Sequence, residues 1–160
     1  MDDRYLQYLE AANRTFVDQI KSADQKAAYV LTVVLALLVS SADARDAFRW
    51  TAYSERPLHL ALIGAALSAS VMVAFIAALS VTLPRIRPGR SVLYWGAWPA
   101  AGDRLIEARD GDRTDFIFDE YYQSTRVLAG ICLSKFRTLR LAFLSLLAAA
   151  ASYGLLLVFA

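Results

Sequence analysis

The 160-residue sequence has one cysteine and one histidine, and this scarcity excludes several kinds of protein. Cys132 alone cannot form a disulfide within the chain, and together with His59 it supplies too few ligands for a structural zinc site. The sequence also lacks a glycine-rich phosphate loop and a serine–histidine–aspartate set in a usable context. A net charge of +2 is too small to indicate nucleic-acid binding. We therefore expect no enzymatic activity, no metal and no resident cofactor.

Charge is scarce over three long apolar stretches. Residues 27–42 and 141–160 carry no charged side chain, and residues 58–83 contain only His59 as a titratable group. At a rise of about 1.5 Å per residue, the last two can cross a hydrocarbon core of roughly 30 Å, and Lys26 can extend the first by reaching toward the head groups. The sequence therefore predicts an all-α membrane protein with three transmembrane helices and cytosolic helical extensions.

Lysine and arginine counts predict the orientation of these spans. Residues 1–26 hold four basic residues and residues 84–140 hold ten, whereas the loop 43–57 holds three. The positive-inside rule then places the N-terminus inside. Because the first apolar run follows a mostly polar segment, a cleavable signal peptide is not expected. The predicted parts are a cytosolic amphipathic helix (1–26), transmembrane helix 1 (27–42), an external loop (43–57), transmembrane helix 2 (58–83), a cytosolic segment with a long final helix (84–140) and transmembrane helix 3 (141–160).

Periodicity predicts that the first and last spans continue as helices outside the bilayer. Apolar or small residues recur every three or four positions in the first segment, at Tyr5, Leu9, Ala12, Phe16, Ile20, Ala23 and Ala27. A similar face runs along a final helix that begins near Asp115, through Ile117, Tyr121, Leu128, Ile131 or Cys132, Lys135 and Ala142. Between them we expect an irregular element at 85–102, with a short helix around Asp103–Arg109. The acidic residues that follow are expected in a turn, a helix cap and a solvated face: Asp110, Asp112, Asp115, Asp119 and Glu120.

Small and aromatic residues predict contacts at the membrane. Small residues recur on the second and third spans, at Gly64 and Ser68, at Ala61, Ala65 and Ala69, and at Ala148, Ser152 and Gly154. Such faces let helices pack closely in lipid, either within one chain or between copies of a homo-oligomer. Trp50 and Tyr53 in the loop are the amphipathic aromatics typical of a membrane interface.

Four charged residues lie at the predicted membrane edge: Asp24, Lys26, Lys135 and Arg140. Asp24 and Lys135 each fall on the apolar stripe of a helix, shortly before its span, so we expect them to form an interhelical pair. Lys26 is two residues from Asp24 and cannot face it on the same helix. The group is either a structural pair that sets helix register or a switch that responds to a ligand or partner.

A basic segment followed by aromatics is the candidate ligand site. Arg85, Arg87 and Arg90 are either positive-inside anchors or guanidinium groups that bind a phosphate. Tyr94, Trp95 and Trp98 are either interfacial residues or a platform on which a nucleobase stacks. Three residues of the final helix are candidates to complete such a pocket: Tyr121, Tyr122 and Arg126.

An ordered set of three stretches resembles a known family. Residues 20–27 read IKSADQKA, residues 83–85 read LPR and are followed by YWG at 94–96, and residues 134–142 read SKFRTLRLA. In this order, and with these spans, the sequence resembles the Pycsar system transmembrane effector family (PycTM-like) over residues 14–160. Trp98 and Pro99 are a local departure from the family pattern.

The resemblance implies an antiphage defence effector of the bacterial cell inner membrane, multi-pass, that is paired with a pyrimidine cyclase through its product. The ligand would be a cyclic pyrimidine mononucleotide, cUMP or cCMP, and the response would be impaired membrane integrity and abortive infection. Two alternatives of other classes remain. One is a structural membrane scaffold that recruits a cytosolic partner, and the other is a membrane-bound hydrolase, which the lack of a nucleophile with a base disfavours.

Overall fold

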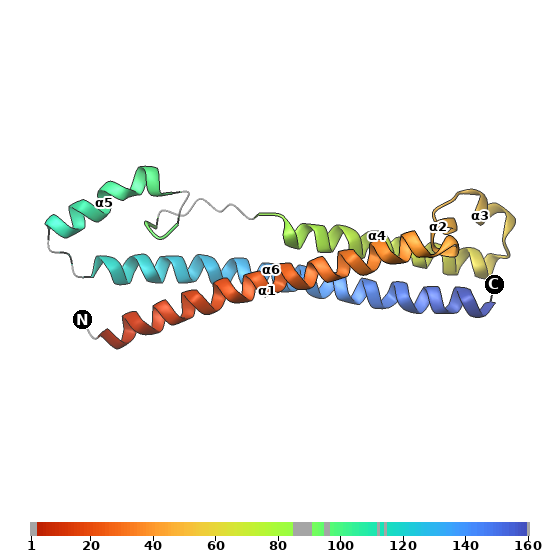
Figure 1. Cartoon of the computed structure of the whole chain (residues 1–160), viewed down its shortest axis with the longest axis horizontal. Helices are drawn as coiled ribbons and strands as arrows, with labels where there is room; N and C mark the ends of the chain where they lie inside the picture. Colours follow the sequence, from red (N-terminus) through yellow and green to blue (C-terminus); the bar gives the residue numbers. More distant parts are fainter. Residues whose placement is uncertain (1–2, 85–90, 95–96, 112, 114, 160) are drawn as a thin grey trace. The chain divides into compact units, whose positions relative to one another are not determined.

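The computed structural model describes residues 3–84, 91–94, 97–111, 113 and 115–159. Its helices are α1 (Asp3–Ser40), α2 (Ala42–Asp46), α3 (Thr51–Glu55), α4 (Leu58–Thr82), α5 (Trp98–Asp110) and α6 (Phe116–Phe159) (Figure 1). No strand occurs within these ranges. Three helices, α1, α4 and α6, are long and apolar enough to cross a membrane. The prediction of an all-α membrane protein with three transmembrane helices is therefore confirmed.

The lengths of the spanning helices follow from where proline and glycine occur. Residues 3–40 contain neither, and α1 runs without a break from its polar half into its apolar half. Pro57 is the N-cap residue of α4, and Leu83, which precedes Pro84, is extended with φ −63° and ψ 134°. A residue before proline is disfavoured in the α region, so α4 ends at Thr82.

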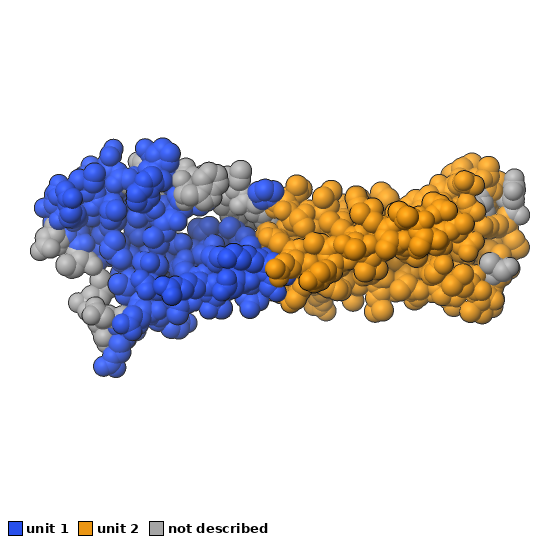
Figure 2. Space-filling view, in the orientation of Figure 1, with its two compact units in different colours: residues 1–22, 84–134 blue, residues 23–83, 135–160 orange. Residues whose placement is uncertain are grey.

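The chain divides into two compact units (Figure 2). Unit 1 comprises residues 1–22 and 84–134, and unit 2 comprises residues 23–83 and 135–160. Helices α1 and α6 each supply residues to both units, whereas α4 lies in unit 2 and α5 in unit 1.

The core of unit 2 is a set of buried aliphatic and small residues on α1, α4 and α6. Along each helix most of these positions recur at intervals of three or four, or at their sum of seven, which is the spacing of helices that pack in the manner of a coiled coil. They are Ala23, Ala27, Val30 and Val34 on α1, Leu67, Val71, Ala74, Ala77, Ala78 and Val81 on α4, and Leu139, Ala142 and Ala149 on α6.

The outward surface of unit 2 is also apolar. Large exposed hydrophobic residues occur on all three of its long helices, among them Val33, Val39, Leu62, Ile76, Leu147 and Val158. Proteins in water rarely expose large continuous apolar surfaces. A bilayer is the solvent that fits this surface, because lipid tails are as apolar as these side chains.

Part of the small-residue face of α4 is occupied from within the chain. The Tyr53 hydroxyl donates a hydrogen bond to the Ala47 carbonyl and lies 3.1 Å from the Ser68 hydroxyl, and a Cβ at Gly64 would lie 4.0 Å from Tyr53 Cε1. The sequence predicted Tyr53 only as an interfacial aromatic. In the structure it also packs on α4. Trp50, in contrast, is 86% exposed.

Other small residues remain uncovered in this chain. Ala65 and Ala69 on α4 and Ala148 and Gly154 on α6 are exposed, and nothing lies within 4 Å of a Cβ placed at Gly154. These faces stay available for association between copies or for lipid.

Three predictions about unit 1 are wrong in detail. Helix α5 begins at Trp98, with Pro99 in its first turn, so the stretch predicted as irregular ends earlier than 102. Tyr5 is 65% exposed and Ile117 is 38% exposed, although both fall on predicted apolar faces. At the start of α6 the buried face is instead formed by Phe116 and, one turn later, Glu120. Ile117 therefore points away from that face.

Candidate functional site

Asp24 and Lys135 form an ion pair in unit 2. Asp24 lies on α1 and Lys135 on α6, and the Lys135 ammonium donates a hydrogen bond to the Asp24 carboxylate. Lys135 is only 4% exposed, whereas Asp24 is half-buried. A buried ammonium without a partner is strongly destabilising, so this pair specifies how α1 and α6 pack. The sequence predicted this proximity, and whether the pair acts as a switch stays a prediction.

The other two predicted edge charges have different surroundings. The Lys26 ammonium lies 5.8 Å from the centroid of the Phe136 ring, which is within the range of a cation–π contact. Arg140 is exposed. Lys26 thus interacts with a ring on α6 and not with the carboxylate two residues before it.

The predicted phosphate and base contacts fall mostly beyond the described residues. Tyr94 is described and half-buried, its backbone N–H donates to the Ser91 carbonyl at 3.1 Å, and its carbonyl accepts from the Ala97 N–H at 2.9 Å. Four residues of the predicted site lie outside the described part of the chain: Arg85, Arg87, Arg90 and Trp95. The site therefore remains a prediction.

Glu120 is the functional candidate that the sequence analysis missed. It was predicted on a solvated face, but it is 1% exposed. Its Oε1 accepts a hydrogen bond from Arg104 Nη2 at 3.0 Å, and its Oε2 accepts one from the backbone N–H of Val92 at 2.7 Å. The Ser91 hydroxyl donates to its carbonyl at 3.3 Å. A carboxylate tolerates burial only with such partners, so Glu120 joins α5, α6 and the segment before α5.

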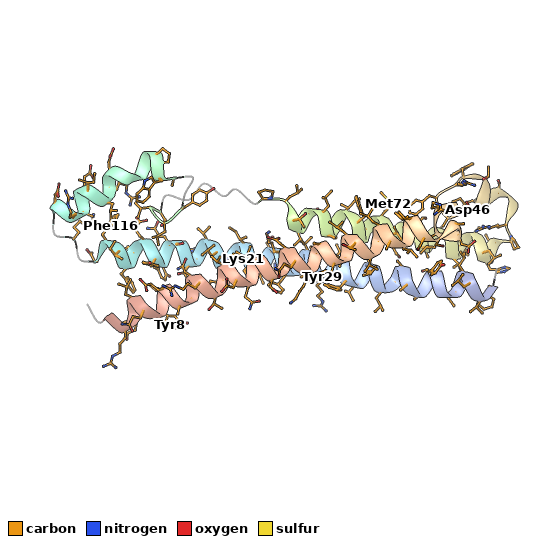
Figure 3. All side chains as sticks on the ribbon, in the orientation of Figure 1. Tyr8, Lys21, Tyr29, Asp46, Met72 and Phe116 are labelled. Atoms are coloured by element: carbon orange, nitrogen blue, oxygen red, sulfur yellow. The ribbon has the colours of Figure 1, made fainter. Side chains whose placement is uncertain are left out.

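A cavity of about 460 Å³ lies beside Glu120 in unit 1. Its volume is within the range of about 300–1,000 Å³ that is typical of small-molecule sites. The buried ring of Phe116, labelled in Figure 3, lies 5.7 Å from Arg104 Cζ and 5.9 Å from Arg113 Cζ. The lining residues are Arg104, Glu107, Ala108, Arg113, Phe116, Asp119, Glu120 and Gln123. This wall offers charged donors, acceptors and an aromatic ring to a polar ligand.

A polar cluster joins α1 and α6 within unit 1. The Asn13 amide donates to the Thr125 hydroxyl and to the Tyr121 carbonyl, the latter at 3.4 Å, and the Ser124 hydroxyl donates to Asn13 Oδ1 at 2.9 Å. Thr125 also donates to the Tyr121 carbonyl at 2.7 Å. These directional bonds fix the register of the two helices.

The three predicted additions to the pocket do not gather at the cavity. The backbone carbonyl of Tyr121 accepts hydrogen bonds within the polar cluster. Burial, and after it the negative charge of Glu10, raises the pKa of the Tyr121 hydroxyl above its ordinary value. Tyr122 is 54% exposed, and Arg126 is also exposed. Within the described ranges, no three histidine, cysteine, aspartate or glutamate side chains form a group that would hold a metal ion.

Comparison with protein families shows the family to which the chain belongs. The family model of the Pycsar effector protein domain matches residues 8–160, which is nearly the whole chain. No curated protein and no solved structure matches the chain.

Proposed function

Since the chain belongs to the Pycsar effector family, we propose that it is an antiphage effector that senses cUMP or cCMP and impairs the integrity of the bacterial inner membrane. A pyrimidine cyclase activated by infection would supply the ligand, and death of the infected cell would limit the phage. The family match over residues 8–160 carries this proposal.

The distribution of polar and apolar surface supports the proposal. Unit 2 presents apolar side chains outward on three helices of membrane length, and unit 1 contains a polar cavity of ligand size. Helices α1 and α6 are continuous and supply residues to both units, so they provide a covalent connection between a sensing part and a membrane part.

The response requires two states of the membrane part. A ligand shifts such an equilibrium only by as much as its affinity for the two states differs. We assign the Asp24–Lys135 pair, with Lys26 and Arg140 nearby in sequence, as the group whose contacts differ between the closed state and a leaky, assembled state. A homo-oligomer is the arrangement in which the uncovered small faces of α4 and α6 would be used.

The orientation follows from the basic residues and is open to a direct test. We place the N-terminus and residues 84–140 in the cytosol. In a Cys132→Ala background, Thr51→Cys should react with an impermeant maleimide added to intact cells from which the outer membrane has been removed. Asp115→Cys should react only after lysis. The reverse pattern would contradict the orientation.

Leakage from liposomes tests the function. Purified protein is reconstituted into vesicles loaded with a self-quenched dye, and cUMP, cCMP or cAMP is added. We expect dye release with at least one pyrimidine nucleotide and none with cAMP or in vesicles without protein. Correctly inserted protein that releases no dye with either pyrimidine nucleotide would contradict the proposal and favour a membrane scaffold instead.

A further inference from the structure

The cavity between α5 and α6 has one wall that is held in place without a ligand. Glu120 is buried and bonded to Arg104 and to the Val92 N–H, and Phe116 is buried against Val92 and Ala108. Fixed side chains of this kind lower the entropy lost on binding. The cavity is therefore suited to a specific small ligand.

The charges that line the cavity are not equivalent. Arg104 is paired with Glu120 and so is largely neutralised in its effect on a ligand. Arg113 lines the same cavity, is exposed, and lies over the Phe116 ring. A guanidinium is planar and matches two oxygens of a phosphate at once. Arg113 is thus the group on this wall that fits the single negative charge of a cyclic phosphodiester.

Two carboxylates, Glu107 and Asp119, also line the cavity. An ionised carboxylate accepts hydrogen bonds and donates none. It therefore suits the N4 amino group of cytosine, whereas it repels the C4 carbonyl of uracil, which is itself an acceptor. Gln123, also on the lining, has both a donor and an acceptor and suits either base.

From these contacts we infer that the α5–α6 cavity is the nucleotide site, that Arg113 binds the cyclic phosphate, and that Asp119 selects cytosine over uracil. The inference rests on the proposed function and names its ligand as cCMP. It also moves the phosphate contact from Arg85, Arg87 and Arg90 to Arg113.

Binding to the purified 160-residue protein in nanodiscs, measured by calorimetry, tests the phosphate contact. Arg113→Ala should weaken cCMP binding by about 10-fold or more, because it removes a charge-assisted hydrogen bond. Arg109→Ala is the matched control, since Arg109 is exposed on α5, pairs with Asp110 and does not line the cavity. It should bind cCMP as the wild type does. Arg113→Lys keeps the charge without the planar fork and should lie between the two.

A change of base preference tests the role of Asp119, because a merely structural role would not produce it. The wild type should bind cCMP more tightly than cUMP, and Asp119→Asn should reduce that preference by about 10-fold, since the amide can donate to the uracil carbonyl. Asp115→Asn, at an exposed aspartate one turn earlier that does not line the cavity, should leave the preference unchanged.

The outcomes separate the inference from the proposed function. If Arg113→Ala binds as the wild type does while combined replacement of Arg85, Arg87 and Arg90 by alanine abolishes binding, the cavity is not the site, although nucleotide-dependent leakage would keep the function. A wild type that prefers cUMP would overturn the assignment of Asp119. A wild type that binds no cyclic nucleotide and releases no dye would remove the proposed function, and the inference with it.

Discussion

Different interactions stabilise the interior of each of the two units. In unit 2 the buried contacts are mainly aliphatic and small, at heptad-like spacing, with one ion pair between α1 and α6. In unit 1 helices are joined by directional polar contacts, those of Asn13 between α1 and α6 and those of Glu120 between α5 and α6. The packing of the apolar unit therefore gains specificity from the Asp24–Lys135 pair, whereas the site in the polar unit is formed by side chains that fix one another.

The largest expected effect is the loss of Glu120. Glu120→Ala removes the acceptor of the Arg104 Nη2 hydrogen bond and of the Val92 N–H, and we expect it to destabilise unit 1 by about 3 kcal/mol. Hydrogen exchange measured by mass spectrometry should show faster exchange in α5 and in residues 116–134, with α4 unchanged. Equal loss of protection in α4 would contradict independent stabilisation of the two units.

Removal of one partner of the membrane-edge pair should have the next largest effect. Asp24→Ala leaves the buried Lys135 ammonium unpaired, at an expected cost of about 2–3 kcal/mol in unfolding by dodecyl sulfate in mixed micelles. The exchanged pair Asp24→Lys with Lys135→Asp should recover part of this loss. If the double variant is no more stable than Asp24→Lys alone or Lys135→Asp alone, the two charges do not interact as the structure places them.

Overpacking of the apolar core should have a somewhat smaller effect. Ala142 on α6 is fully buried, and Ala142→Leu should destabilise unit 2 by about 1–3 kcal/mol in the same unfolding experiment. Ala151→Leu, at an exposed position of the same helix, is the matched control and should change stability little. Equal effects of the two substitutions would contradict the assignment of buried and lipid-facing sides.

The smallest effect is expected at an exposed ion pair on α1. Lys21 Nζ lies 3.8 Å from Asp18 Oδ1, and both side chains are more than 70% exposed. Asp18→Ala should therefore change the free energy of unfolding by less than about 0.5 kcal/mol. A loss as large as that of Asp24→Ala would show that charge on α1, and not the buried pair, controls stability.

Much of the fold could be predicted because its causes are local in sequence. Uncharged stretches of sufficient length indicate spans, and proline marks the ends of α4. The Asp24–Lys135 pair was predictable because each charge lies on an apolar stripe just before a span, so each needs a partner at a similar depth.

The candidate site was harder to predict because its partners are distant in sequence. Glu120 stands among aspartates and tyrosines that suit a solvated helix, and its burial depends on Arg104 and on the backbone at Val92. Its spacing of four from Phe116 was the available signal, since both residues share one face of α6. The neighbouring acidic residues pointed the other way, because aspartate and glutamate side chains are mostly exposed.

Hydrogen exchange of the protein in nanodiscs, with and without cCMP, tests most directly whether unit 1 senses and unit 2 responds. We expect slower exchange in α5 and in residues 116–134 on adding cCMP, altered exchange in α4 in the same sample, and neither change with cAMP. A change in α4 without any protection of α5 and residues 116–134 would contradict the assignment of unit 1 as the part that senses the ligand.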